Sequence, residues 1–173
     1  MFYEPGKTAH NLPHDPFKAC VAPRPIGWIS TVDTNGRPNL APYSFFNAVH
    51  GNPPMVMFSS GGSVDSLKNA SDTGEFVAAV APKSMLREIN FCSAPLPPGE
   101  DEFEYAGLEK LPATCVKPHL IKGVPIHMEC EVFQKPLPSN AKIFGSNPCY
   151  LIAGLFHESD AQAQTNCHRN SLM

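Results

Sequence analysis

Residues 20–60 read CVAPRPIGWISTVDTNGRPNLAPYSFFNAVHGNPPMVMFSS, and this segment predicts the first three strands of the protein. Residues 25–32 alternate between the two sides of an extended chain, a period of two that is typical of a β-strand. Residues 33–37 contain Asn-Gly, which supplies the positive φ values that a tight hairpin needs. Residues 38–44 are therefore predicted to return antiparallel to the first strand. Residues 55–60 form an apolar run behind two prolines and predict a third strand.

The chain that follows predicts short helices and further strands around this hairpin. Asp65 or Ser63 can cap a short helix that Gly74 ends, and Ser84 opens a second helix with one buried face. Further strands are predicted at residues 75–81, 124–134 and 149–156. Because strands and helices do not alternate, these roughly six strands predict a mainly β, antiparallel barrel rather than a doubly wound parallel sheet.

The composition fits one domain with a substantial core. The chain has 173 residues, of which 42% are hydrophobic and 17% charged, and this length is enough to bury a core. Its 19 prolines disfavour long helices and central strands. We expect a single domain over residues 1–173, with an extended arm at 1–19, an acidic loop at 93–105 that is either a solvated surface or a lid, and an atypical polar tail at 157–173.

Charge and targeting signals narrow the class of partner. The net charge is −3 without a basic block, so no nucleic-acid partner is expected. The N-terminus is polar and broken by proline, unlike a signal peptide, and no apolar run is long enough to span a bilayer. The six cysteines show no CxxC spacing. We therefore expect free thiols, a cytoplasmic location and no membrane association.

The common catalytic motifs are absent from the sequence. It contains no GxSxG, HExxH or GxxxxGK[ST], and no GxGxxG after a strand, so neither a hydrolytic triad nor a metal site is indicated. What remains is a set of hydroxyl and amide side chains beside aromatics at residues 44–47, 59–63 and 65–69. Hydroxyls, backbone amides and a helix N-terminus together suit a phosphate. Residues 44–47, here called the elbow, could face a flat isoalloxazine ring, although serine-rich turns are often only turns.

The order of these motifs resembles the flavin reductase-like family of FMN-binding split β-barrel proteins. The motifs that carry the resemblance are PRPIGWIST, DTNG and NLAPYSFFN, followed by DSLKN and TGEFV. The likeness covers about residues 15–156. It implies a Greek-key split barrel that forms a homodimer, with FMN near the subunit interface. It also implies hydride transfer from NAD(P)H to the flavin, often in the service of a monooxygenase.

The resemblance assigns a set of cofactor-binding residues and no catalytic side chain or metal ligand, because the cofactor carries the chemistry. It places Ser44, Phe45, Phe46 and Asn47 around the isoalloxazine ring. It places Ser59, Ser60, Ser66 and Asn69 near the ribityl chain and phosphate. Arg24 and Thr31 are further candidates. Simpler interpretations stand beside these: the two phenylalanines as core, Ser59 and Ser60 as a strand cap, and Arg24 as a partner of the acidic loop. His127 or His157 could help to place the nicotinamide.

Two departures from the family pattern leave the activity open. Val64 stands where relatives carry a lysine that could pair with the phosphate, so Lys68 would have to replace that cation. The chain also ends in an unrelated polar tail instead of the elements usual in relatives. These departures favour a non-catalytic FMN-binding or dimerisation module, or a shortened inactive paralogue. The intact elbow favours an FMN-binding, NAD(P)H-dependent flavin reductase or related oxidoreductase.

Overall fold

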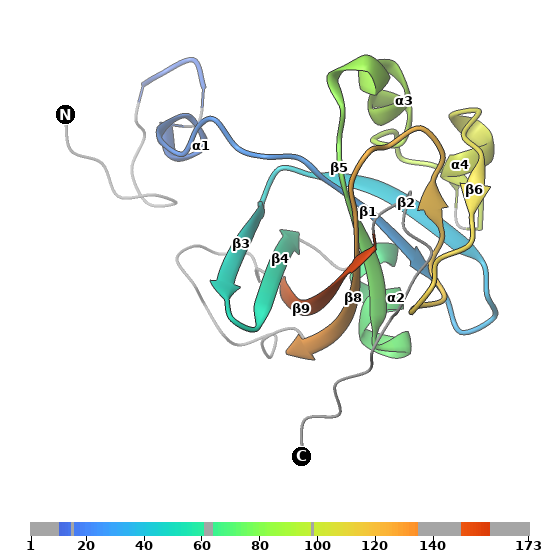
Figure 1. Cartoon of the computed structure of the whole chain (residues 1–173). Helices are drawn as coiled ribbons and strands as arrows, with labels where there is room; N and C mark the ends of the chain where they lie inside the picture. The colour runs from blue at the N-terminus through green and yellow to red at the C-terminus, as the bar shows by residue number, and fades with distance from the viewer. Residues whose placement is uncertain (1–10, 15, 61–63, 98, 135–149, 160–173) are drawn as a thin grey trace.

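The computed structural model describes residues 11–14, 16–60, 64–97, 99–134 and 150–159, the last segment through its backbone. Within these residues the protein is mainly β, with short helices (Figure 1). Every pair of neighbouring strands in the main sheet runs antiparallel. The predicted mainly β, antiparallel class is therefore confirmed.

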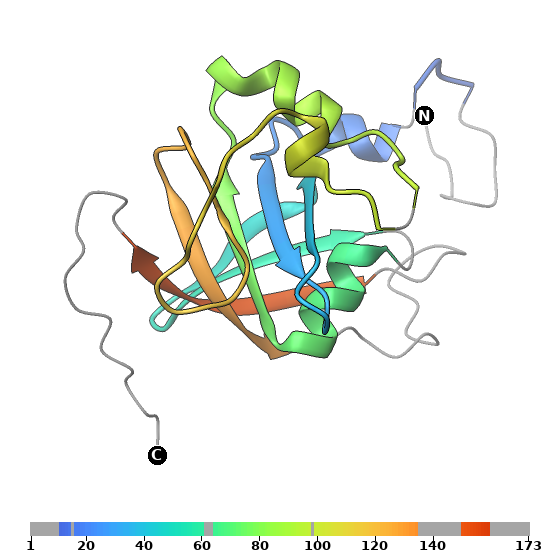
Figure 2. The same cartoon turned by 90° about the vertical axis from the view of Figure 1, so that its right-hand side faces the viewer.

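The main sheet has seven strands in the order β2-β1-β5-β8-β9-β4-β3, and a small sheet pairs β6 with β7. The strands are β1 (Gly27–Val32), β2 (Pro38–Tyr43), β3 (Phe46–Gly51), β4 (Pro54–Ser60), β5 (Glu75–Val80), β6 (Lys110–Leu111), β7 (Leu120–Ile121), β8 (His127–Gln134) and β9 (Tyr150–Ser159). The helices are α1 (Pro16–Cys20), α2 (Asp65–Thr73), the 3₁₀ turn η1 (Lys83–Met85), α3 (Leu86–Phe91) and α4 (Glu102–Tyr105). Figure 2 shows α3 and α4 together on one side of the strands.

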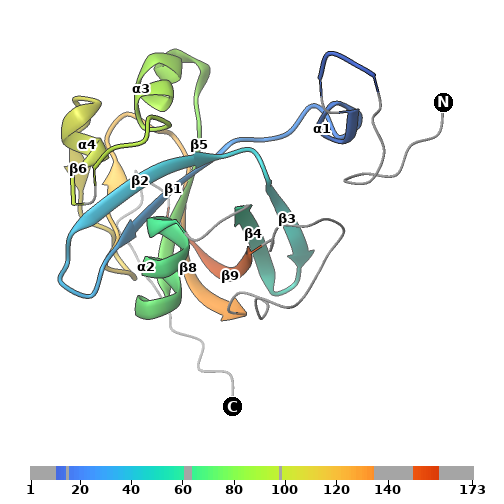
Figure 3. The same cartoon turned by 180° about the vertical axis from the view of Figure 1, so that it is seen from behind.

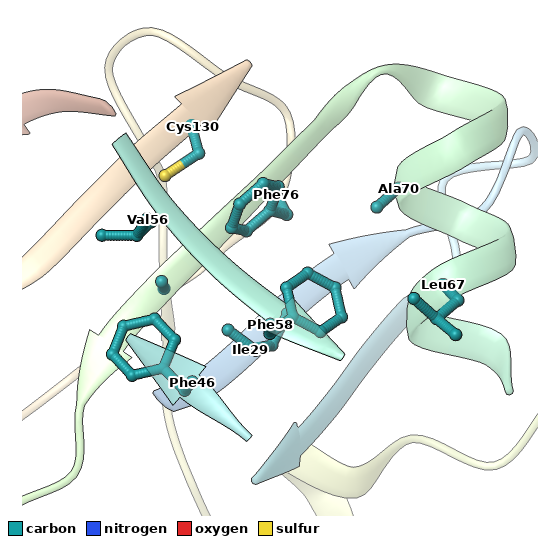
Figure 4. Close-up of a cluster of buried hydrophobic side chains, with 9 residues drawn as sticks. Ile29, Phe46, Val56, Phe58, Leu67, Ala70, Phe76 and Cys130 are labelled. Atoms are coloured by element: carbon teal, nitrogen blue, oxygen red, sulfur yellow. The ribbon is translucent and has the colours of Figure 1, made fainter. Parts of the chain in front are cut away.

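Strand β1 is buried along its whole length because both faces of the sheet are covered. On the inner face, Ile29 packs with side chains of β3, β4 and β5 and with Leu67 and Ala70 of α2 (Figure 4). Helix α2 lies beside β1 and β2 when the molecule is seen from behind (Figure 3). On the outer face, Trp28 packs with Phe103 of α4 and with the segment that carries β7. The hairpin quoted first is therefore the centre of two cores.

The hairpin between β1 and β2 forms as predicted, but its turn differs. Only Gly36 takes a positive φ there, at 81°, so the prediction that Asn35 does so as well is wrong. The Asp33 carboxylate accepts hydrogen bonds from the backbone N–H groups of Asn35 and Arg37, each at 2.8 Å. A side-chain acceptor thus organises the predicted turn at residues 33–37, which contains one left-handed glycine instead of two residues with positive φ.

The α2 helix is predicted correctly in extent, but its cap is not. Val64 occupies the N-cap without a side-chain hydrogen bond, so Asp65 lies in the first turn instead of capping the helix. Gly74 ends the helix in the left-handed region, at φ 77°, as predicted.

Several short elements escape the sequence patterns. The elbow leads into β3, α1 interrupts the predicted arm, and α4 lies inside the predicted acidic loop. Each is too short to show a hydrophobic period. β9 also runs through Ser159, so the first residues of the predicted tail belong to a strand. Residues 1–10 of the arm and 160–173 of the tail lie outside the described residues.

The cysteines agree only in part with the expectation of free thiols. Cys20, Cys92 and Cys130 are free, whereas Cys115 is disulfide-bonded, so the expectation of free thiols is wrong at that position. Disulfide pairing depends on proximity in the fold, which cysteine spacing alone does not show. Burial raises the pKa of the Cys92 thiol to about 12, which makes this thiol a poor nucleophile. Among the described helices, none is long and apolar enough to cross a membrane.

Candidate functional site

The elbow connects β2 to β3 and is held from two sides. Phe46 is 8% exposed and packs over Gly27, where an added Cβ would lie 2.5 Å from atoms of the Phe46 ring. The Phe45 carbonyl accepts a hydrogen bond of 2.9 Å from the Ser59 backbone N–H. A glycine is therefore required under the elbow, and β4 fixes the position of the elbow backbone. Phe46 belongs to the inner core, which supports the simpler interpretation of that residue.

Phe45 differs from Phe46 because it is 38% exposed. The guanidinium carbon of Arg24 lies 5.5 Å from the centroid of its ring, a cation–π arrangement. Arg24 Nη1 also donates to the carbonyl oxygens of Lys18 and Val21, each at 2.6 Å. Arg24 thus connects the C-terminal end of α1 to the exposed ring of the elbow.

The remaining polar residues of the elbow and of β4 vary in accessibility. Asn47 is exposed, and its Oδ1 accepts a hydrogen bond of 2.9 Å from the Ala48 N–H. Ser44 and Ser60 are half-buried, whereas Ser59 is buried. The structure therefore brings the predicted ring-binding residues and Ser59 into one neighbourhood. Of these residues, Phe45, Asn47 and Ser44 have side-chain atoms that are accessible to a ligand.

A buried polar cluster lies between α2 and the hairpin and contains three of the predicted residues. It is formed by Thr31, Asn39, Ser66 and Asn69. Asn39 Nδ2 donates to Ser66 Oγ at 2.8 Å and to Thr31 Oγ1 at 3.4 Å. Asn69 Nδ2 donates to the same Thr31 oxygen at 3.3 Å. Asn39 was not among the predicted site residues; the observed hairpin register places it opposite Thr31.

Tyr43 connects this cluster to the start of the elbow. Burial raises the pKa of the Tyr43 phenol; a hydrogen bond with Ser66 opposes this, and the nearby carboxylates of Asp65 and Glu102 raise the pKa further. Glu102 reaches back from α4, where its Oε2 accepts a hydrogen bond of 3.0 Å from the Leu40 N–H. Burial also raises the pKa of the Glu102 carboxyl. Two carboxylates, those of Asp65 and Glu102, thus act on the Tyr43 phenol.

His127 lies on the outer side of the sheet, beneath the segment that carries β7. It is 3% exposed, and its Nε2 accepts a hydrogen bond of 3.0 Å from the Ile121 N–H. Burial lowers the pKa of its imidazole. This geometry makes His127 a neutral acceptor that holds the backbone of β7. The prediction that it places a nicotinamide remains untested, and the side chain of His157 lies outside the described structure.

The comparisons with known proteins agree on one class. The model of the flavin reductase like domain matches residues 20–146, so the chain belongs to this family. An uncharacterized protein of Aquifex aeolicus is 37% identical over 131 residues, which are 72% of this chain and 67% of that protein. The uncharacterized protein BH2278 of Halalkalibacterium halodurans is 35% identical over 144 residues, 79% of this chain and 68% of that protein.

A solved structure supports the same class. The crystal structure of nitrilotriacetate monooxygenase component B from Bacillus cereus has 31% sequence identity and a TM-score of 0.77, and the likeness covers 92% of this chain and 81% of that one. The predicted family is therefore confirmed, and with it the flavoprotein class that the family implies.

Proposed function

We propose that the protein binds FMN and acts as an NAD(P)H-dependent flavin reductase or a related oxidoreductase. The observation that carries the proposal is the elbow, because it presents an exposed aromatic ring and accessible polar atoms at a backbone position fixed by β4 and Gly27. When bound, the flavin supplies the capacity to accept a hydride and pass electrons on. The protein supplies binding, orientation and electrostatics.

Each residue of the elbow has a proposed task. Phe45, with Arg24 beside it, presents an aromatic surface to the ring system, and Ser44 and Asn47 offer polar atoms to its edge. Phe46 sets the shape of the elbow from below. Ser60, half-buried at the end of β4, and the N-terminal turn of α2 lie on the side assigned to the ribityl chain. Ser59 contributes chiefly through its backbone.

We extend the proposal to assembly and partners on the strength of the family. The strands are proposed to close into a Greek-key split barrel within a single domain over residues 1–173, and two copies to form a homodimer around the flavin. The likeness to a monooxygenase component B supports a monooxygenase as the recipient of reduced flavin. A cytoplasmic location is proposed with these partners.

The test begins with the visible absorption spectrum of the purified protein during titration with FMN. Anaerobic addition of NADH and NADPH should then bleach the flavin bands. Phe45→Ala should weaken FMN binding by about tenfold, because loss of one aromatic contact is worth on the order of 1 kcal/mol or more. Flavin that binds but is not reduced supports the non-catalytic module instead. A folded protein that binds no flavin overturns the proposal.

Phe91→Ala is a matched control for this substitution. Phe91 is 37% exposed, close to the 38% of Phe45, and Arg87 lies 5.3 Å from its ring centroid, as Arg24 does for Phe45 at 5.5 Å. It belongs to α3, not to the elbow. Equal losses of FMN affinity in both variants would show that the elbow has no special part in binding.

A further inference from the structure

A segment with little regular structure covers the outer face of the main sheet. Residues 112–126, here called the covering segment, connect β6 to β8 and contain only the two-residue strand β7. Figure 2 shows this part of the chain lying across β5 and β8. The apolar side chains that pack it against Trp28 and Val77 of the sheet are Ile121, Val124, Val116 and Leu120. The covering segment therefore depends on the sheet for its position.

Titratable side chains of the sheet also bind the backbone of the covering segment. The side chains that accept its hydrogen bonds are Glu75 of β5 and His127 and Glu129 of β8. The donors are the backbone N–H groups of residues 114, 115, 117 and 121, at distances of 2.5–3.1 Å. Protonation reduces the accepting capacity of carboxylates and imidazoles, because the added proton occupies an acceptor site. Acid therefore acts directly on the contacts that hold the covering segment.

His127 is the acceptor that loses its bond completely on protonation. Because its Nε2 accepts from the Ile121 N–H at 3.0 Å, the proton of the neutral ring lies on Nδ1. Within the described residues, Nδ1 is buried and has no hydrogen-bond partner. A second proton would lie on Nε2 and face the Ile121 N–H, in a residue that is 3% exposed. An unpaired buried donor and a buried charge both destabilise this closed arrangement, so the protonated ring favours an open one.

The strands around His127 contribute one group that favours the protonated ring. Glu129 lies two residues further along β8. Burial lowers the pKa of His127 more than the carboxylate of Glu129 raises it. The residues opposite His127 in the sheet register, Ala79 of β5 and Ser159 of β9, carry no charge. The closed arrangement therefore keeps the imidazole neutral.

The covering segment carries a second histidine that responds to acid in the same direction. Burial lowers the pKa of His119, and the charge of Lys110 adds to this effect while Asp101 opposes it. The lysines of the segment, Lys117 and Lys122, are exposed to solvent. When the segment leaves the sheet, His119 takes up a proton more readily and adds to the effect of His127.

From these contacts we propose that the covering segment is an acid-sensitive cover: when His127 takes up a proton from solvent, the segment leaves the outer face while the main sheet stays folded. Opening uncovers the apolar surface around Trp28 and Val77, which is shielded near neutral pH. The open form binds the proton more readily than the closed form, so opening becomes more frequent as pH falls below about 6.5, the usual pKa of an imidazole. This device acts on the face opposite Phe46 and does not depend on flavin binding.

Hydrogen exchange of the full-length protein between pH 7.5 and 5, with and without low concentrations of urea, tests the local opening. The measured quantity is the protection factor, which corrects for the intrinsic pH dependence of amide exchange. One proton taken up by the open form makes opening up to about thirtyfold more frequent at pH 5. The Ile121 amide should therefore lose about tenfold or more of its protection. Because local opening exposes little surface, low urea should leave this protection unchanged while it reduces that of Ile29 in β1.

Equal protection and equal urea dependence at Ile121 and Ile29 would mean that the segment leaves only when the whole protein unfolds, which overturns the proposal. This comparison uses the wild-type protein, so it is decisive even if a variant does not fold. An Ile121 protection that does not fall between pH 7.5 and 5 overturns the proposal as well.

His127→Gln tests the titrating group, because the glutamine oxygen accepts from the Ile121 N–H but takes up no proton in this pH range. The pH-dependent loss of Ile121 protection should be at least about threefold smaller in His127→Gln than in the wild type, with His119 responsible for the remainder. His50→Gln is the matched control, since His50 is exposed on β3, at the edge of the main sheet. It should behave as the wild type. Equal pH dependence in the two variants overturns the role of His127.

Discussion

Replacing Glu129 by glutamine should release the segment that covers the outer face of the sheet. Glu129 is fully buried on β8, and its carboxylate accepts hydrogen bonds from the backbone of the covering segment. The Thr114 N–H lies 3.1 and 3.0 Å from its two oxygens, and the Cys115 N–H lies 2.5 Å from Oε2. One side chain thus satisfies two consecutive donors of a segment that has little regular structure of its own.

The magnitude follows from how many of these bonds glutamine can keep. Glutamine retains one oxygen and replaces the other by an NH₂ group, so one backbone donor faces another donor. A hydrogen bond to a charged group contributes about 1.5–3 kcal/mol. The variant no longer buries a charge. Because desolvating a carboxylate is unfavourable, this recovers part of the free energy lost with the hydrogen bond. We expect Glu129→Gln to lower the free energy of unfolding by about 2 kcal/mol.

Urea unfolding of the wild type and the variant, followed by circular dichroism, measures this difference. Hydrogen exchange locates it, since the Thr114 and Cys115 amides should exchange faster in Glu129→Gln while the β1 amides change less. Glu131→Gln is the control, because Glu131 lies two residues along the same strand with an exposed side chain. A loss below about 0.5 kcal/mol, the range of ordinary surface substitutions, would show that these hydrogen bonds do not hold the covering segment.

Three further predictions concern other contacts of the fold. Because burial lowers the pKa of His127 below its usual value, the unfolded chain binds a proton that the folded protein does not. Stability should therefore fall as pH decreases below about 6.5, and His127→Gln should reduce this slope in urea titrations at several pH values. Gly27→Ala should destabilise the protein by about 1–3 kcal/mol, because its methyl group would overlap the Phe46 ring; an unchanged thermal midpoint would contradict this. Asn39→Ala should cost about 1–2 kcal/mol and increase hydrogen exchange in α2, since it removes two bonds of the buried polar cluster; equal exchange in α2 would contradict its structural role.

Burial is the main cause of the lowered pKa of both His127 and His119. Burial lowers the pKa of His119 as well, with Lys110 adding to the effect. His127→Gln is therefore expected to leave a residual pH dependence from His119. A double variant that still shows the full slope would place the responsible groups elsewhere. Comparing the single and double variants shows how much of the pH dependence of stability comes from His127, whose ring accepts the hydrogen bond from the Ile121 N–H.

The local structure of this protein and its family could be predicted from the sequence. The alternation in β1, the Gly74 helix end and the apolar strands predict most of the sheet, because side-chain period and glycine conformation are local properties. The motifs of the same stretch predicted the family, and the match to the family model confirmed the family, whereas the role of the elbow in binding stays a prediction. Short elements such as β3 and α4 could not be predicted, since they depend on neighbouring strands or on a few capping contacts.

The directions in which the polar side chains point depend on the tertiary structure. A serine or asparagine on α2 can face a ligand or face the hairpin, and its identity is the same in both cases. Asn39 and Thr31, which are distant from α2 in sequence, determine that Ser66 and Asn69 face inward. Arg24 likewise contacts Phe45 because the pairing of β1 with β2 brings the chain just before β1 next to the chain just after β2. The orientation of a polar side chain, and therefore its function, depends on hydrogen-bond partners that are far away in the chain. A local sequence pattern cannot predict these partners.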